Sequence, residues 1–260
     1  MEPFVKRNPK APNGFFACEA AGLSWLGAAE SGVPCVAVLR HDATSLTLQR
    51  LDVIAPDAAS AYDFGRRLAR THASGAPAFG APPDGWTGPG FFGPMSHPLP
   101  MSLTGHASWG TFYAEERLAP MAERAGPHLD GTLHQGLNRV IERCASGDFD
   151  DDDGPSRLHG DLWSGNVMWT PDGAVFIDPA AHGGHRETDL AMLALFGCPH
   201  HDTVIDGYEA QRRLRAGWRL RIGLHQLYPL LAHVVLFGSG YLDSVALAIS
   251  SALTQADRLS

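Results

Sequence analysis

Residues 158–178 of this chain hold carboxylates and an amide at spacings that suit phosphoryl transfer. The segment reads L-H-G-D-L-W-S-G-N-V-M-W-T-P-D-G-A-V-F-I-D, with Asp161 and Asn166 at D-x-x-x-x-N spacing and Asp178 at the end of an apolar strand. Phosphoryl transfer needs a carboxylate that orients a substrate hydroxyl and accepts its proton. It also needs oxygen ligands that hold Mg²⁺ on the β- and γ-phosphates. These residue types therefore predict a site for metal-assisted phosphoryl transfer.

Two residues near the start of the chain complete an ordered set. Lys6 lies in F-V-K-R, a short strand candidate, and Glu19 lies in an apolar helical pattern. Each residue has an ordinary structural alternative, such as a turn or cap for Asp161 and Asn166 or plain solvation for Lys6. The order Lys, Glu, Asp, Asn, Asp together with the D-x-x-x-x-N spacing matches that of protein kinases and favours the chemical interpretation.

Hydrophobic periodicity predicts the elements that position these residues. We expect strands at 4–7, 34–40 and 45–51, helices at 15–26, 57–74, 111–125 and 129–146, a hairpin at the P-D-G turn, and a helical end. Residues 75–110 are rich in Gly, Pro and aromatic residues, which predicts a loop that acts as a substrate lid or packs on the surface. The layout indicates an α+β fold of two lobes, a small lobe over 1–53 and a larger helical lobe over 54–260.

Composition excludes several classes of partner. The 20 basic and 28 acidic residues give a net charge of −8, which disfavours binding to nucleic acid or to an anionic membrane. The four cysteines are scattered, and the N-terminus lacks the apolar core of a signal peptide, so we expect a soluble cytoplasmic protein. The acidic run at 149–154 is expected to be a solvated loop, and C-P-H-H-D at 198–202 a helix end rather than a zinc site. An outer helix face is expected for Arg212, Arg213, Arg215, Arg219 and Arg221.

Several motifs together resemble the fructosamine kinase (ketosamine 3-kinase) family, in the aminoglycoside-phosphotransferase-like branch of the protein-kinase-like fold. The resemblance extends over about residues 4–240, and its most specific feature is Trp163 within H-G-D-L-W-S-G-N. Its other motifs are F-V-K-R-N-P, F-F-A-C-E-A-A-G-L-S-W-L, W-G-T-F-Y-A-E-E-R-L, D-P-A and G-H-R-E-T-D-L-A-M.

The resemblance implies a role for each matching residue. Asp161 would be the catalytic base, braced by His159, and Asn166 and Asp178 would bind Mg²⁺. Lys6, paired with Glu19, would bridge the α- and β-phosphates of ATP. The segment at 48–51, including Gln49 and Leu51, would meet adenine; Trp163, His185 and Glu187 would lie on the substrate side; and Asp189 would support the catalytic loop.

The implied reaction transfers the γ-phosphoryl group of ATP to the 3-hydroxyl of a ketosamine. Such a substrate is a fructosamine- or ribulosamine-type adduct of a small amine or of a glycated lysine, as in protein deglycation. One alternative is another small-molecule phosphotransferase that acts on an aminoglycoside or an amino alcohol such as choline. The other is a kinase-fold remnant with impaired catalysis.

The remnant alternative rests on the N-terminus. Kinases of this fold begin with a two-stranded hairpin whose Gly-rich loop covers the ATP phosphates, whereas only three residues precede Phe4 here. We therefore expect an N-terminally truncated sheet of three strands with an exposed edge at residues 4–7. That edge offers a surface for homodimerisation.

Overall fold

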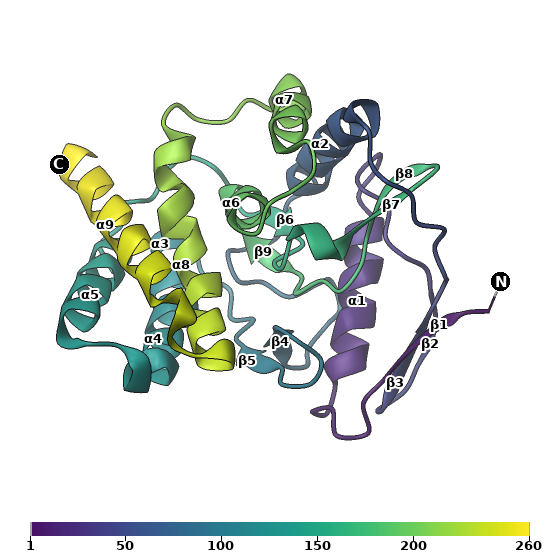
Figure 1. The fold of residues 1–260 in the computed structure, drawn as a ribbon, viewed down its shortest axis with the longest axis horizontal. Helices are drawn as coiled ribbons and strands as arrows, with labels where there is room; N and C mark the ends of the chain where they lie inside the picture. The colour runs from purple at the N-terminus through teal and green to yellow at the C-terminus, as the bar shows by residue number, and fades with distance from the viewer. Residues whose placement is uncertain (1, 260) are drawn as a thin grey trace.

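The computed structural model describes residues 2–259, beginning with a three-stranded antiparallel sheet that packs on one long helix (Figure 1). The strands are β1 (Phe4–Arg7), β2 (Val38–His41) and β3 (Ser45–Leu48), and the helix is α1 (Phe15–Gly27). The order in the sheet is β1-β3-β2, with Lys6 opposite Leu46. β3 is the central strand and pairs with both neighbours, and all four of its residues are buried.

β1 is an edge strand, as the sequence indicates. Its Phe4 and Val5 side chains are 47% and 46% exposed. The expected three-stranded sheet with an open edge is therefore present in the structure. Pairing of this edge with a second copy of the chain stays a prediction, as does the division of the chain after residue 53.

α1 is buried on most of its surface because it lies between the small sheet and the larger lobe (Figure 1). Phe16, Leu23 and Leu26 are at most 2% exposed. At Gly22 an added Cβ would press on Ala181. Ala181 follows residues 158–178, the catalytic segment predicted from the sequence, so glycine permits the close approach of the two lobes.

The larger lobe consists mainly of helices with three small hairpin-like strand pairs. Its helices are α2 (Ala58–Ala73), α3 (Trp109–Tyr113), α4 (Ala119–Ala125), α5 (Gly131–Ala145), α6 (Glu187–Leu195), α7 (His201–Gln211), α8 (Trp218–Phe237) and α9 (Leu242–Leu259). A π-helical turn over Ala114–Leu118 joins α3 to α4. Its strand pairs are β4 (Gly90–Phe92) with β5 (Leu99–Met101), β6 (Ser156–Leu158) with β9 (His182–Gly184), and β7 (Val167–Thr170) with β8 (Gly173–Phe176).

The β7–β8 hairpin connects the two lobes through backbone hydrogen bonds. Val36 N donates to Phe176 O at 3.0 Å, and Phe176 N donates to Pro34 O at 2.9 Å. The hairpin ends at Phe176, and only Ile177 separates it from Asp178. These bonds therefore place Asp178 at the junction, next to the small sheet.

α2 and α7 pack closely through glycine. A Cβ at Gly65 would collide with the backbone oxygen of Val204, and one at Gly207 would collide with that of Tyr62. The close contact brings α2 and α7 near enough for side chains of both helices to support the catalytic segment.

Residues 75–110 are not a loop throughout, since they contain β4 and β5, whose pairing places Phe92 opposite Leu99. α8 is the one helix in the described part of the chain that is long and apolar enough to cross a membrane. Half of that stretch is buried inside the protein, where α8 packs against α6 and α9, so α8 is a core helix.

Candidate active site

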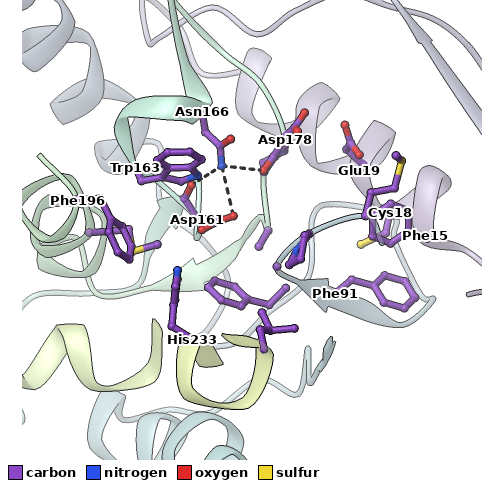
Figure 2. A pocket seen from close by; sticks show the side chains of 18 of the residues that line it. Phe15, Cys18, Glu19, Phe91, Asp161, Trp163, Asn166, Asp178, Phe196 and His233 are labelled. Atoms are coloured by element: carbon purple, nitrogen blue, oxygen red, sulfur yellow. Dashed lines mark hydrogen bonds between the residues drawn. The ribbon is translucent and has the colours of Figure 1, made fainter. Parts of the chain in front are cut away.

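A cavity of about 610 Å³ opens between α1, the β4–β5 hairpin, the catalytic segment and the C-terminal end of α8 (Figure 2). Its lining includes five of the residues that the sequence suggests for catalysis and cofactor binding, namely Lys6, Glu19, Asp161, Asn166 and Asp178. Residues from both lobes thus contribute to one site.

The loop that carries Asp161 depends on Gly160. Gly160 has a φ of +82°, and a Cβ there would collide with the carbonyl oxygen of Ala180. Asn166 closes the loop because its amide nitrogen donates to the Asp161 backbone oxygen at 2.8 Å and to Asp161 Oδ2 at 3.3 Å. The spacing between the two residues therefore corresponds to a closed loop with both side chains at the cavity (Figure 2).

Asp161 is poised to take up a proton near neutral pH. Burial raises the pKa of its carboxyl to about 7, and the negative charges of Asp178 and Asp189 act in the same direction. The hydrogen bond from Asn166 partly opposes this change. A carboxylate with a pKa near the working pH is well suited to general base catalysis.

Lys6 joins the two lobes electrostatically. Its Nζ lies 2.8 Å from both carboxylate oxygens of Glu19 and 2.9 Å from Oδ1 of Asp178. Burial alone would lower the pKa of Lys6, but the charges of Glu19 and Asp178 outweigh it, and the pKa is raised. Lys6 therefore remains a cation, and a cation at this cavity can bind an anionic group such as a phosphate.

Asp178 has a backbone conformation that is rare for a residue with a side chain. Its φ is +54°, in the left-handed region. Such strain persists only where the surrounding structure enforces it, and it is concentrated at functional sites. The result here is a carboxylate directed at Lys6 and 41% exposed to the cavity side.

Asp189, at the start of α6, holds the catalytic loop from below. Its fully buried carboxylate accepts hydrogen bonds from His159 N at 2.8 Å and from Gly160 N at 3.0 Å. It also accepts one from His72 Nε2 at 3.2 Å, which leaves His72 Nδ1 to accept from the Tyr208 hydroxyl at 2.8 Å. His72 and Tyr208 were not predicted from the sequence, since no local pattern links α2 and α7 to residue 189.

His159 is buried beneath the loop and does not line the cavity, in agreement with the expectation that it braces the loop. Its Nε2 donates to the carbonyl oxygen of Ile177 at 2.9 Å, so Nδ1 accepts from Asp161 N at 3.3 Å. His159 thus contacts the backbone on both sides of the site. This is the arrangement of a residue that positions the loop rather than one that touches a substrate.

A second hollow of about 690 Å³ lies on the other side of Lys6 and Asp178. Its walls include Gln49 and Leu51, together with apolar side chains of the small sheet. The N–H of Gln49 already donates to Ala37 O at 2.9 Å, so Gln49 does not offer that donor to a ligand. The hollow's apolar walls fit a flat base such as adenine.

His185 and Glu187 do not line the cavity, in contrast to the expectation that they lie on the substrate side. Both are at most 3% exposed. Glu187 accepts from Nε of Arg221 at 2.7 Å and from its Nη2 at 2.5 Å, while His185 Nε2 lies 3.3 Å from Asp151 Oδ2. They therefore tie the start of α6 to neighbouring segments of the large lobe.

The acidic run at 149–154 is only in part the solvated loop that the sequence predicts, since Asp150 and Asp152 are exposed whereas Asp151 and Asp153 are paired. Asp153 accepts from Arg186 Nε at 2.7 Å and from Arg212 Nη2 at 3.2 Å. Asp151 and Asp153 are only 11% and 13% exposed, and Arg215 also pairs with Asp151. Arg212 and Arg221 accordingly pair with carboxylates that are at most 13% exposed, whereas the Arg215 side chain is 40% exposed.

Aromatic and apolar side chains form the rest of the cavity wall. Trp163 is 40% exposed and lines the cavity, as the sequence indicates. Within the segment predicted as a lid or as packing, Phe91, Phe92 and Met95 line the cavity, while Trp109 is buried in the core. Four more aromatic or apolar residues near the end of the chain were not expected, namely His233, Leu236, Phe237 and Tyr241.

Comparisons with known proteins identify the family of this chain. The family model for fructosamine kinase matches residues 1–255. A protein of Enterococcus faecium named as a probable ketoamine kinase is 33% identical over 242 residues, which is 92% of this chain and 83% of that protein.

Solved structures give the same result. The structure of a protein assigned as a fructosamine-3-kinase from Thermobifida fusca is 44% identical, with a TM-score of 0.88 over 97% of this chain and 85% of that one. A ternary complex of the aminoglycoside phosphotransferase APH(4)-Ia with ADP and hygromycin B shares the fold alone, at 17% identity and a TM-score of 0.55 over 94% and 83%. The chain therefore belongs to the fructosamine kinase family and is an ATP-dependent phosphotransferase with a protein-kinase-like fold.

Proposed function

We propose that this protein transfers the γ-phosphoryl group of ATP to the 3-hydroxyl of a ketosamine, with Asp161 as the base. The observation that carries the proposal is the position of Asp161. Its buried carboxyl lies in the cavity between the ion group of Lys6, Glu19 and Asp178 and the aromatic side that includes Trp163 (Figure 2). A hydroxyl bound on the aromatic side would meet the carboxylate and a phosphate held at Lys6.

In this arrangement each residue has a separate role. Asp161 orients the sugar hydroxyl and accepts its proton as the new O–P bond forms. Lys6, held by Glu19, binds the phosphates of the nucleotide. The apolar hollow beside residues 48–51 would take the base, so the nucleotide would extend from that hollow past Lys6 to the cavity.

The donor set suits Mg²⁺, which prefers carboxylate and amide oxygens. Asp178 has one oxygen paired with Lys6 and a second that is available to a cation. Asn166 uses its amide nitrogen within the loop, which leaves its Oδ1 for the same cation. When bound there, Mg²⁺ would neutralise charge on the β- and γ-phosphates.

The cavity favours a ketosamine over an aminoglycoside. The charged lining residues are limited to Lys6, Glu19, Asp161 and Asp178, which surround the phosphate side. An aminoglycoside carries several ammonium groups and would need further carboxylates around the acceptor side. The substrate would be a fructosamine- or ribulosamine-type adduct of an amine or of lysine, as in protein deglycation. The four cysteines are free thiols, which supports work in a reducing cytoplasm.

A panel of acceptors tests the proposal. The purified protein is supplied with Mg-ATP and, in separate reactions, a lysine ketosamine, an aminoglycoside and choline, and the phosphorylated product is identified by mass spectrometry and ³¹P NMR. We expect a phosphate on the 3-hydroxyl of the ketosamine. Phosphorylation of the aminoglycoside or choline alone would replace the proposed substrate with one of the alternatives.

A further inference from the structure

Four aromatic side chains that line the cavity lie close to one another. We call this set, Phe196, His233, Phe237 and Tyr241, the aromatic wall. The ring of His233 lies 4.8 Å from Phe196, 5.3 Å from Phe237 and 5.0 Å from Tyr241, between ring centroids. In Figure 2, Phe196 and His233 lie on the Trp163 side of Asp161, away from Glu19.

The aromatic wall carries no formal charge. Among the described residues, the Asp, Glu, Lys and Arg side chains that line the cavity are Lys6, Glu19, Asp161 and Asp178, and none of them belongs to the aromatic wall. A group that binds at the wall must therefore be apolar, or it must be a cation that can be stabilised by ring faces and by a neutral hydrogen-bond acceptor.

His233 supplies such an acceptor. Its Nδ1 lies 2.7 Å from the carbonyl oxygen of Pro229, one turn earlier in α8. Because a carbonyl oxygen can only accept, Nδ1 carries the proton, and Nε2 of the neutral ring is a bare acceptor. Burial lowers the pKa of His233 below its ordinary value of 6.5, which keeps the ring neutral at pH 7. No residue in the described part of the chain hydrogen-bonds to this Nε2.

A ketosamine presents the complementary group. Its nitrogen is a secondary amine that is protonated at neutral pH, so it carries two N–H donors and no acceptor. It also carries a substituent, which is the apolar stem of the parent amine. Resting on the proposed function, we propose that the aromatic wall binds this amine half, with Nε2 of His233 accepting an N–H from the ammonium and Phe237 and Tyr241 packing on the stem.

The test compares two substrates that differ at one atom. One is the ketosamine of fructose and benzylamine, and the other is 1-O-benzyl fructose, in which an ether oxygen replaces the N–H₂⁺ group. His233→Phe keeps a ring but removes the acceptor, so we expect kcat/KM to fall about 10- to 100-fold for the ketosamine. For the ether, kcat/KM should stay within about twofold of the wild-type value, since the ether has no N–H to donate to His233.

Phe237→Ala should lower kcat/KM for both substrates about 3- to 10-fold through lost apolar contact. Phe237 is 59% exposed, so this change is expected to leave folding intact. Leu220→Ala, at a 51% exposed position on the same helix outside the cavity, is the matched control and should change neither substrate. His233→Gln restores an acceptor and should recover part of the preference for the amine.

The outcomes separate the two proposals. If the wild type phosphorylates neither substrate, the proposed function fails. If the ketosamine is phosphorylated but His233→Phe lowers kcat/KM equally for amine and ether, the function stands and the inference about the aromatic wall is wrong. If His233→Phe melts below the assay temperature, His233→Gln decides. The quantity compared is kcat/KM for the ketosamine divided by kcat/KM for the ether. A ratio equal to that of wild type, or between that value and one, supports the inference, whereas a ratio of one overturns it.

Discussion

Replacing Asp189 by asparagine would test how the catalytic loop is held. In the native protein both carboxylate oxygens are used, since His159 N and His72 Nε2 donate to Oδ2 and Gly160 N donates to Oδ1. The amide of asparagine has one oxygen and one nitrogen that can only donate. Whichever way it turns, at least one buried N–H would face another donor.

The magnitude follows from these contacts. A buried donor that loses its acceptor costs about 1–3 kcal/mol, and hydrogen bonds to a charged group are worth more than neutral ones. Removing the charge also weakens the bonds that remain, so we expect Asp189→Asn to lower the free energy of unfolding by about 2–4 kcal/mol. Because the displaced segment carries Asp161 and not the nucleotide hollow, kcat should fall by about 100-fold or more while the KM for ATP changes little.

The assay is urea unfolding followed by tryptophan fluorescence, together with steady-state kinetics at varied ATP. Asp206→Asn makes the same chemical change at an exposed position of α7 and should leave both measurements unaltered. Wild-type stability and kcat in Asp189→Asn would show that the loop does not depend on this carboxylate, and would refute the argument. A rise in the KM for ATP with unchanged kcat would likewise contradict it.

Three further predictions address the base, the ion pair and the loop glycine. Because burial raises the pKa of Asp161 to about 7 and only the ionised form accepts a proton, kcat/KM should rise tenfold per pH unit below pH 7 and level off above it; a flat profile from pH 5.5 to 8 would count against Asp161. Lys6→Met leaves the carboxylate of Glu19 buried without its partner and should cost about 3–5 kcal/mol in urea unfolding. The double variant Lys6→Met/Glu19→Gln should regain most of that stability, but its KM for ATP should stay above that of wild type because Lys6 is still missing. If the double variant regained both wild-type stability and the wild-type KM for ATP, Lys6 would not bind the phosphates. Gly160→Ala should lower stability by about 2–4 kcal/mol, as its φ is +82°, while Gly154→Ala, with open space around it, should melt like wild type in calorimetry.

The core of the site could be predicted from the sequence because local rules place its parts. Asp161 and Asn166 lie in one short loop, and Asp178 lies one residue beyond the end of a hairpin that starts next to Asn166, so chain connectivity keeps them close. Lys6 and Glu19 needed the further information that a strand and a helix in this order belong to a kinase-like lobe. The structure brings all five residues together at one cavity.

The aromatic wall could not be predicted in this way. His233 and Phe237 lie on α8, and only the packing of α8 against α6 brings them to the cavity of Asp161. An apolar helix with a histidine is equally consistent with an ordinary core helix, so the sequence carries no signal that separates the two.

The acidic run shows where a general rule fails. A run of charges is usually solvated, and the sequence of residues 149–154 gives no reason to expect otherwise. In the structure Asp153 pairs with Arg186 and Arg212, and Asp151 pairs with Arg215, all from distant parts of the chain. The buried charges are tolerated because each has a partner, and only the fold identifies those partners.

The most direct test of the account is the transfer of phosphate from Mg-ATP to a lysine ketosamine by wild type and by Asp161→Asn, measured as ADP release and as phosphorylated product. Both proteins are first shown to be folded by thermal melting. We expect product that depends on the ketosamine, with a rate about 10²- to 10⁴-fold lower in the variant, since loss of the general base removes a contribution of this order. Product formation at an undiminished rate by folded Asp161→Asn would contradict the central claim.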